Sequence, residues 1–213
     1  MTQSTTGLIL RTRPLTETSL IVNWLTPDCG RVSTVAKGAR RPKSPFRGKL
    51  DLFYLADFSF QRSRRSDLHQ LREVNLRDTN RMLRQDLASL EQAAYCAALL
   101  EQSTETETPL PALFELMGSL LDQLAQRPPQ LQTRFAFELK LLKELGQSPD
   151  LLKAKLTLGS RRILAELTDK DWPALARLRL SEPQIRELNQ FLHGFLIYHL
   201  GKIPGRRGAV TGG

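Results

Sequence analysis

The chain has 213 residues, 40% of them hydrophobic, which is enough to bury a core in one large domain or two small ones. Its formal charge of +9 at pH 7 predicts attraction to polyanions, either nucleic acid or an anionic membrane surface, but carries no information about the fold. The only two cysteines, Cys29 and Cys96, exclude a disulfide framework and a cysteine zinc site within one chain.

The positive charge is concentrated in the first third of the chain. Residues 1–80 hold 14 Lys and Arg against 7 Asp and Glu, whereas residues 81–213 hold 17 against 15. The apolar run Gly7–Leu10 is only four residues long and ends at Arg11, so we expect neither a signal peptide nor a membrane-spanning segment there. These features predict a soluble cytoplasmic protein with two domains, residues 1–80 and 81–213.

Residues 1–80 have the pattern of short strands separated by turns. In "TSLIVNWLT" apolar side chains alternate between two faces, and the turn "PDCG" follows directly. Asp28 and Gly30 suit a tight hairpin, which predicts antiparallel pairing of Ser19–Thr26 with Arg31–Ala36. Further strands in "DLFYLADFSFQ" and "LHQLREVNL" bring the total to about five in 75 residues.

Five strands closed into a small Greek-key barrel form the OB-fold, whose loops and open face bind oligonucleotides. We therefore predict an α+β protein with an N-terminal OB-fold. An SH3-like barrel remains an alternative on strand count alone.

Residues 81–213 change to a helical period. Apolar residues recur at three- and four-residue spacing in "RQDLASLEQAAYCAALLEQ" and again in "PALFELMGSLLDQLAQ". A third helix, "QTRFAFELKLLKELG", is predicted to end at Gly146. Ser181 and Gln184 have capping-box spacing at the start of the last helix, which runs to Gly201. The second domain is predicted to be all-α, although Lys153–Leu180 is hard to assign.

The stretch "AKGARRPKSPFRGKL" connects two predicted strands and is strongly basic. No acidic residue occurs between Asp28 and Asp51, so these cations cannot pair locally with carboxylates. A second basic cluster lies in the next strand connection. Arginine forks bind phosphate oxygens and lysines supply point charge, so the two loops together predict a phosphate-binding groove. The cations are Lys37, Arg40, Arg41, Lys43, Arg47 and Lys49, with Arg62, Arg64 and Arg65 in the second cluster.

Aromatic side chains in this region are expected to form mainly the barrel core. Tyr54, Phe58 and Phe60 share one face of their strand by the period of two, and a small barrel needs about that many large side chains. Phe46 lies within the basic loop, so we predict base stacking only there.

No sequence pattern of catalysis is present. Gly38 and Gly48, followed by Lys49, do not have P-loop spacing, and the three histidines offer no metal-ligand spacing. We therefore expect a binding protein without a metal or cofactor, rather than an enzyme, in which the histidines lie at the surface or in packing positions.

The opening of the chain resembles the RecO family of bacterial recombination mediators. The similarity rests on a basic residue and proline, then "ETS", a glycine before a strand, "AKGARR", and a later serine and glycine. Later stretches, "DLHQLREV", "FELKLLKELGQSPDL" and "YHLGKIPGRR", are also similar to the family. The residues that match its opening pattern are Arg13, Pro14, Glu17, Thr18, Ser19, Gly30, Ala36, Lys37, Gly38, Ala39, Arg40, Arg41, Ser44 and Gly48.

This resemblance implies an OB-fold joined to a helical domain, binding of single- and double-stranded DNA, and annealing of complementary strands. It also implies partnership with RecR in loading RecA onto strands coated by single-stranded DNA-binding protein (SSB). Arg13 joins the candidate DNA-binding residues on this basis. Many members carry a four-cysteine zinc module after the "LG…P" signature, whereas Asp150–Leu167 contains no cysteine here. We therefore expect no zinc.

The resemblance further implies a pocket for the acidic, hydrophobic SSB tail in the helical domain. Such a tail needs an apolar slot with a cationic rim. Two places are candidates: Phe135, Leu139 and Leu142 beside Arg134 and Lys140, or the basic end with Lys202, Arg206 and Arg207.

Two other functions stay open from the residues alone. An RNA-binding OB-fold protein, such as a ribosome-associated factor, would show the same charge, because RNA and DNA phosphates are alike. Membrane attachment would need a basic amphipathic helix, whereas the basic cluster lies in a loop rich in proline and glycine. We therefore expect no membrane partner.

Overall fold

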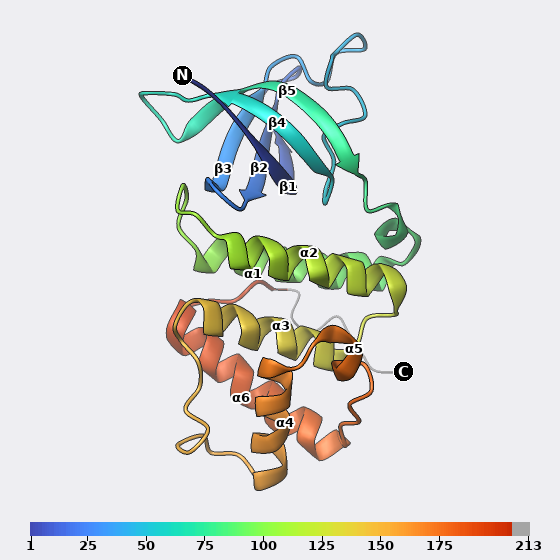
Figure 1. The fold of residues 1–213 in the computed structure, drawn as a ribbon, viewed down its shortest axis with the longest axis vertical. Helices are drawn as coiled ribbons and strands as arrows, with labels where there is room; N and C mark the ends of the chain where they lie inside the picture. Colours follow the sequence, from blue (N-terminus) through green and yellow to red (C-terminus); the bar gives the residue numbers. More distant parts are fainter. Residues whose placement is uncertain (206–213) are drawn as a thin grey trace. The chain divides into compact units, whose positions relative to one another are not determined.

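The computed structural model describes residues 1–205, which form two compact units (Figure 1). The barrel unit consists of Met1–Arg81 and Thr104–Glu115, and the helical unit consists of Met82–Ser103 and the chain from Leu116 onward. The predicted α+β class is confirmed. The sequence predicts a boundary after residue 80, but it contains no sign that a later segment belongs with the barrel.

The barrel unit is a closed five-stranded barrel of the OB type. Its strands are β1 (Thr2–Pro14), β2 (Leu20–Thr26), β3 (Gly30–Ala36), β4 (Leu55–Gln61) and β5 (Leu68–Asp78). They close in the order β1-β2-β3-β5-β4, with β3 and β5 parallel and the other pairs antiparallel. The predicted hairpin is confirmed, since Thr26 pairs with Gly30 and Leu20 with Ala36.

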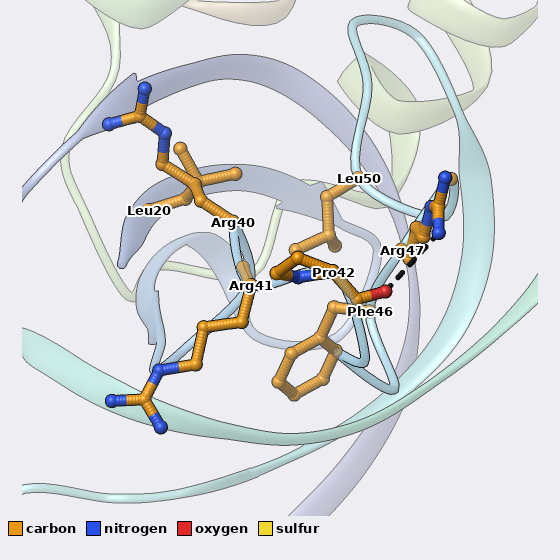
Figure 2. A pocket seen from close by; sticks show the side chains of 9 residues that line it. Leu20, Arg40, Arg41, Pro42, Phe46, Arg47 and Leu50 are labelled. Atoms are coloured by element: carbon orange, nitrogen blue, oxygen red, sulfur yellow. Dashed lines mark hydrogen bonds between the residues drawn. The ribbon is translucent and has the colours of Figure 1, made fainter. Parts of the chain in front are cut away.

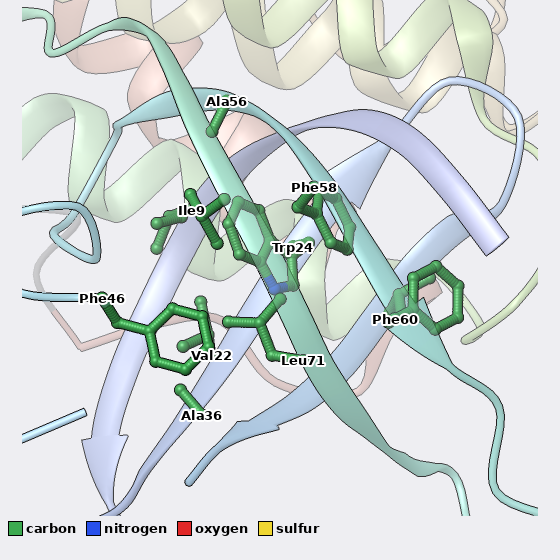
Figure 3. Close-up of a cluster of buried hydrophobic side chains, with 11 residues drawn as sticks. Ile9, Val22, Trp24, Ala36, Phe46, Ala56, Phe58, Phe60 and Leu71 are labelled. Atoms are coloured by element: carbon green, nitrogen blue, oxygen red, sulfur yellow. The ribbon is translucent and has the colours of Figure 1, made fainter. Parts of the chain in front are cut away.

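An aromatic stack fills the barrel interior (Figure 3). The rings of Trp24 and Phe58 are stacked with centroids 4.0 Å apart, and Phe60 follows at 5.6 Å from Phe58. β1 crosses this stack at Gly7, where a Cβ atom would lie 2.7 Å from the Phe58 ring. Glycine is therefore needed at this position for close approach. The alternation predicted for β4 is confirmed by the burial of Phe58 and Phe60.

The segment Thr104–Leu110, here called the strap, is bound to the start of β3. The Arg31 side chain donates from Nε to Thr104 Oγ1 at 2.8 Å, and Glu107 N donates to Arg31 O at 3.0 Å. Gly30 has a φ of +66°, and a Cβ atom there would overlap the Thr108 carbonyl. The hairpin glycine therefore also makes room for the strap.

The helical unit is built around α3, which is buried over most of its surface. A short 3-10 helix, Arg81–Gln85, precedes the first helix. The predicted capping box of Ser181 and Gln184 is confirmed at the start of α6. Within the described part of the chain, no helix is long and apolar enough to cross a membrane. The helices are α1 (Leu87–Ser103), α2 (Pro111–Gln126, whose first turn is grouped with the barrel unit), α3 (Leu131–Glu144), α4 (Leu158–Asp169), α5 (Trp172–Leu175) and α6 (Glu182–Leu200).

Candidate nucleic-acid interface

The basic loop, residues 37–50, leaves the barrel at the end of β3 and forms successive turns. Gly38 and Gly48 adopt φ values of +67° and +72°, in the left-handed region that favours glycine. Arg40 N donates to Thr18 O at 3.0 Å, and Lys49 N donates to Phe46 O at 3.0 Å. The loop is therefore held by its own turns and by the β1–β2 connection, so its cations project from a defined backbone.

Phe46 anchors this loop in the barrel core. Its side chain is only 7% exposed and belongs to the buried cluster that includes Val22, Ala36 and Leu71 (Figure 3). The prediction that Phe46 stacks on bases is therefore wrong, because the ring faces the core. The loop therefore contributes a large apolar side chain to the close-packed barrel core.

Four exposed cations of the basic loop differ from paired surface charges in their surroundings. Arg40, Arg41, Lys43 and Arg47 form no ion pair with any carboxylate in residues 1–205. Arg40 Nη1 donates to Thr16 O at 3.4 Å and Arg47 Nη1 donates to Pro42 O at 3.3 Å, which leaves most guanidinium N–H groups to solvent or a ligand.

Three other predicted cations differ in their surroundings. Lys49 is half-buried, and its Nζ donates to Val74 O at 3.0 Å, so it ties the loop to β5. Lys37 is exposed directly after β3, and Arg13 is exposed near the end of β1. Lys37 and Arg13 are therefore accessible to a phosphate. Lys49 could bind a phosphate fully only by giving up its hydrogen bond to Val74 O.

A hollow of about 360 Å³ lies within the basic loop (Figure 2). Apolar side chains line its floor and three arginines stand around it. Their guanidinium groups point to different sides in Figure 2. We call it the arginine-rimmed hollow; its lining residues are Leu20, Ala39, Arg40, Arg41, Pro42, Phe46, Arg47, Gly48 and Leu50.

The second basic cluster lies in the β4–β5 connection, at the opposite end of the β3–β5 pair from the basic loop. This follows because β3 and β5 are parallel, and the connection precedes β5 whereas the basic loop follows β3. A second hollow of about 300 Å³ along the barrel face is lined by both Lys37 and Arg62. One cation of each cluster thus lines this hollow, whereas Arg40, Arg41 and Arg47 line a different hollow within the basic loop. Arg64 and Arg65 are exposed.

Arg62 is held by the strap. Its Nη1 lies 3.0 Å from Glu107 Oε2, and its Nε donates to Gln3 Oε1 at 2.8 Å. Glu107 also lies 2.6 Å from Nε2 of the buried His69, whose Nδ1 accepts from Ser63 N at 3.3 Å. Because Nδ1 is the acceptor in this geometry, Nε2 is the nitrogen that donates to Glu107. The sequence offered no signal for Glu107, since 38 residues separate it from His69.

His69 is a packing histidine in this arrangement. Its ring stacks on Phe60 with centroids 5.3 Å apart. No cluster of three or more His, Cys, Asp or Glu side chains arranged for a metal ion occurs in the described part of the chain. Burial raises the pKa of Cys29, and burial raises the pKa of Cys96 well above its usual range, which disfavours the reactive thiolate at both.

The predicted slot for an acidic tail on α3 is wrong. Phe135, Leu139 and Leu142 are at most 1% exposed, because α3 packs against α1, α4, α5 and α6. Arg134 is 4% exposed, with its Nε 4.0 Å from the carboxylate of Glu138. These side chains form the core and offer no surface.

The remaining residues proposed for the tail lie elsewhere. Lys140 Nζ donates to Thr168 O at 3.0 Å and sits 5.9 Å from the centre of the Trp172 ring, and burial lowers its pKa. Lys202 is exposed, and its carbonyl accepts from Gln102. Arg206 and Arg207 lie outside the described residues.

Comparison with known proteins identifies the family. The family model described as "Recombination protein O N terminal" matches residues 1–80, and "Recombination protein O C terminal" matches residues 84–154. The first model therefore covers the whole barrel apart from the strap, including both basic clusters.

Curated relatives agree with the family models, and each is named "DNA repair protein RecO". The protein from Rhodopirellula baltica is 36% identical over 67% of this chain and 53% of its own length. The one from Bacillus subtilis is 32% identical over 68% of this chain and 56% of its own length, so the matches span about half of these two relatives. The one from Anaeromyxobacter sp. (strain K) is 29% identical over 92% of this chain and 91% of its own. From these matches and the five-stranded barrel, the chain belongs to the RecO family.

Proposed function

We propose that this chain is a DNA-binding recombination mediator without catalytic activity of its own. It binds single- and double-stranded DNA, anneals complementary strands and, together with RecR, helps to load RecA onto SSB-coated single strands in DNA repair. Family membership and the name shared by the relatives support the DNA repair role. The observation that carries the proposal is a set of exposed loop cations that pair with no carboxylate within residues 1–205: Arg40, Arg41, Lys43 and Arg47.

The mechanism follows from electrostatics. Two complementary strands repel each other through their phosphates, and a cationic surface reduces that repulsion while it releases condensed counterions. Exposed guanidinium groups bind phosphate oxygens through several N–H donors at once. Because these contacts are made to the phosphates of the DNA backbone, the bases stay free to pair. Annealing by this surface therefore requires no recognition of sequence.

The partner interactions extend the same proposal. SSB has an acidic tail attached to its DNA-bound core. Binding of that tail would raise the effective concentration of this chain at coated strands. The exposed Lys202 and the basic end that contains Arg206 and Arg207 supply the charge for such a contact. The proposed roles of RecR and RecA rest on family membership alone, since no surface of residues 1–205 is specific to either partner.

A strand-annealing assay with the full chain tests this function. We expect faster annealing of complementary oligonucleotides, both bare and coated with SSB, and a rate that falls as salt is raised. Annealing that is unchanged by the protein would contradict the proposal. Competition between single-stranded DNA and RNA of equal length separates the alternative, since strong preference for RNA would indicate an RNA-binding OB-fold protein.

A further inference from the structure

The arginine-rimmed hollow combines two features that a simple anion site does not need. Its floor is apolar, formed by the half-buried Leu20, Ala39 and Leu50 with the ring of Pro42. Its rim carries exposed arginines on different sides of that floor (Figure 2). A free anion would use the rim alone, so the floor indicates a ligand with a flat apolar surface as well as negative charge.

The rim is held in place on both sides of the floor. Arg47 reaches back across the loop to the carbonyl of Pro42, and Arg40 donates to the carbonyl of Thr16. Each guanidinium uses one of its five N–H donors in this way, so the others can bind a phosphate. A ligand on the floor would therefore meet cations at both of its ends.

We propose that the hollow binds one unstacked base of a single strand, with the neighbouring phosphates on Arg40 and Arg41 at one side and on Arg47 at the other. This inference rests on the proposed function. A nucleotide within a strand has the required chemistry, because its base has an apolar face and a phosphate on each side. The volume of about 360 Å³ is in the range of small-ligand sites, roughly 300–1,000 Å³.

The hollow gives the surface a means to distinguish single strands from duplex. In a duplex both faces of each base are covered by the stack, so a base must be unstacked and unpaired before it can enter the hollow. The free-energy cost of this step is smaller for a single strand, whose bases are already unpaired. The side chains that form the floor, Leu20, Ala39, Pro42 and Leu50, are apolar and can contact the face of any base. Preference for single strands should therefore be independent of sequence.

Binding to matched oligonucleotides tests the proposal on the full chain. A 12-nucleotide strand of thymidine and an abasic strand of the same length carry the same phosphates but differ in bases. We expect about tenfold tighter binding of the strand with bases, from stacking at one site. Ala39→Leu fills the floor and should bring this ratio close to one, with abasic binding unchanged. Ala112→Leu, at an exposed alanine outside the hollow, should keep the ratio.

The outcomes separate this inference from the proposed function. Binding of both strands with a ratio near one in the wild type, or a ratio that Ala39→Leu leaves intact, overturns the hollow as a base site while DNA binding stands. Failure to bind either strand overturns both. Displacement of the thymidine strand by a short acidic peptide from the wild type but not from Ala39→Leu would assign the hollow to a peptide and overturn the proposal.

A second measurement needs no variant, which matters because Ala39 packs partly against the barrel core. A strand that contains 4-thiothymine can be cross-linked to the wild-type chain by light, and the attached peptide identified by mass spectrometry. We expect attachment at Leu20 or within residues 39–50, which line the hollow. Attachment confined to other parts of the chain would contradict a base in the hollow.

Discussion

Arginine occurs in two opposite environments in the two units of this chain. In the barrel unit, Arg40, Arg41 and Arg47 are exposed, and among the described residues no carboxylate forms an ion pair with them. In the helical unit, Arg134 is 4% exposed, its Nε is 4.0 Å from Glu138, and its Nη2 donates to Asn189 at 3.3 Å. The comparison shows that residue type alone does not define a phosphate site. An arginine can bind a polyanion only where its side chain is accessible and its charge is not neutralised by a carboxylate.

Substitution of an arginine is expected to change the free energy of unfolding by different amounts in the two environments. Loss of one partner from a buried ion pair leaves a desolvated charge, which is costly, whereas exposed charges contribute little to stability. The helical network extends through Tyr95, whose hydroxyl donates to Glu138 Oε1 at 2.7 Å. Substitutions among the buried polar residues Arg134, Glu138 and Tyr95 should therefore lower the free energy of unfolding. Substitutions of the exposed cations in the basic loop should instead lower the affinity for DNA.

The largest effect is expected from Glu138→Ala. It removes the carboxylate acceptor of Tyr95 and the charge partner of the buried Arg134, so we expect the free energy of unfolding to fall by about 3–5 kcal/mol. Urea denaturation measures this. Arg186→Ala breaks the exposed pair with Glu182 and should cost at most about 1 kcal/mol. Equal losses in the two variants would mean that burial does not separate the two kinds of pair.

Replacement of Arg40, Arg41, Lys43 and Arg47 by alanine tests the basic loop. If each cation neutralises one phosphate of a single strand, the slope of log affinity against log salt should flatten by about 2.8. The unfolding transition should hardly change, because these charges are exposed.

A matched control removes four exposed arginines of the helical unit: Arg162, Arg177, Arg179 and Arg186. It changes the net charge equally and should leave most of the slope. An equal effect of both sets would show that net charge, and not the basic loop, governs binding. Loss of the fold in the loop variant would make the loop a structural element.

Glu107→Ala tests a third situation, in which the strap neutralises Arg62 and accepts from His69. The buried His69 N–H loses its acceptor, so we expect a loss of about 1–3 kcal/mol in urea denaturation. Glu107→Gln keeps an acceptor for the ring and should recover most of it. If both variants lose the same amount, the charge pair with Arg62 and not the histidine would hold the strap.

The smallest effect concerns acid stability at the start of α1. Hydrogen bonds from the side chain and backbone of Ser89 lower the pKa of Asp86 below its ordinary value of 3.8. A lowered pKa adds stability above pH 3.8 that is lost as the pH falls through the folded value. Asp86→Asn keeps a cap but cannot titrate, so its melting temperature should fall less in acid than that of the wild type. Asp122→Asn, at an exposed site, should follow the wild type.

Local patterns determined much of this protein in advance. Alternation over two residues predicted β2 and β4, and spacing over three and four predicted α1 and α2, because each period reflects the geometry of neighbouring residues. The turn residues Asp28 and Gly30 and the capping box at Ser181 acted in the same way. The absence of acidic residues between Asp28 and Asp51 could also be seen in the sequence, because it does not depend on contacts between distant segments.

Burial and long-range pairing were decided only by the tertiary structure. The sequence of α3 shows an apolar stripe with Arg134 and Glu138 beside it, which fits a helix with one open face, but neighbours on several sides bury it. Phe46 lies in a polar loop by sequence and in the barrel core by structure. The contact of Glu107 with His69 joins residues far apart in the chain. A side chain's role depends on what surrounds it, and those surroundings come from segments that local periodicity does not relate.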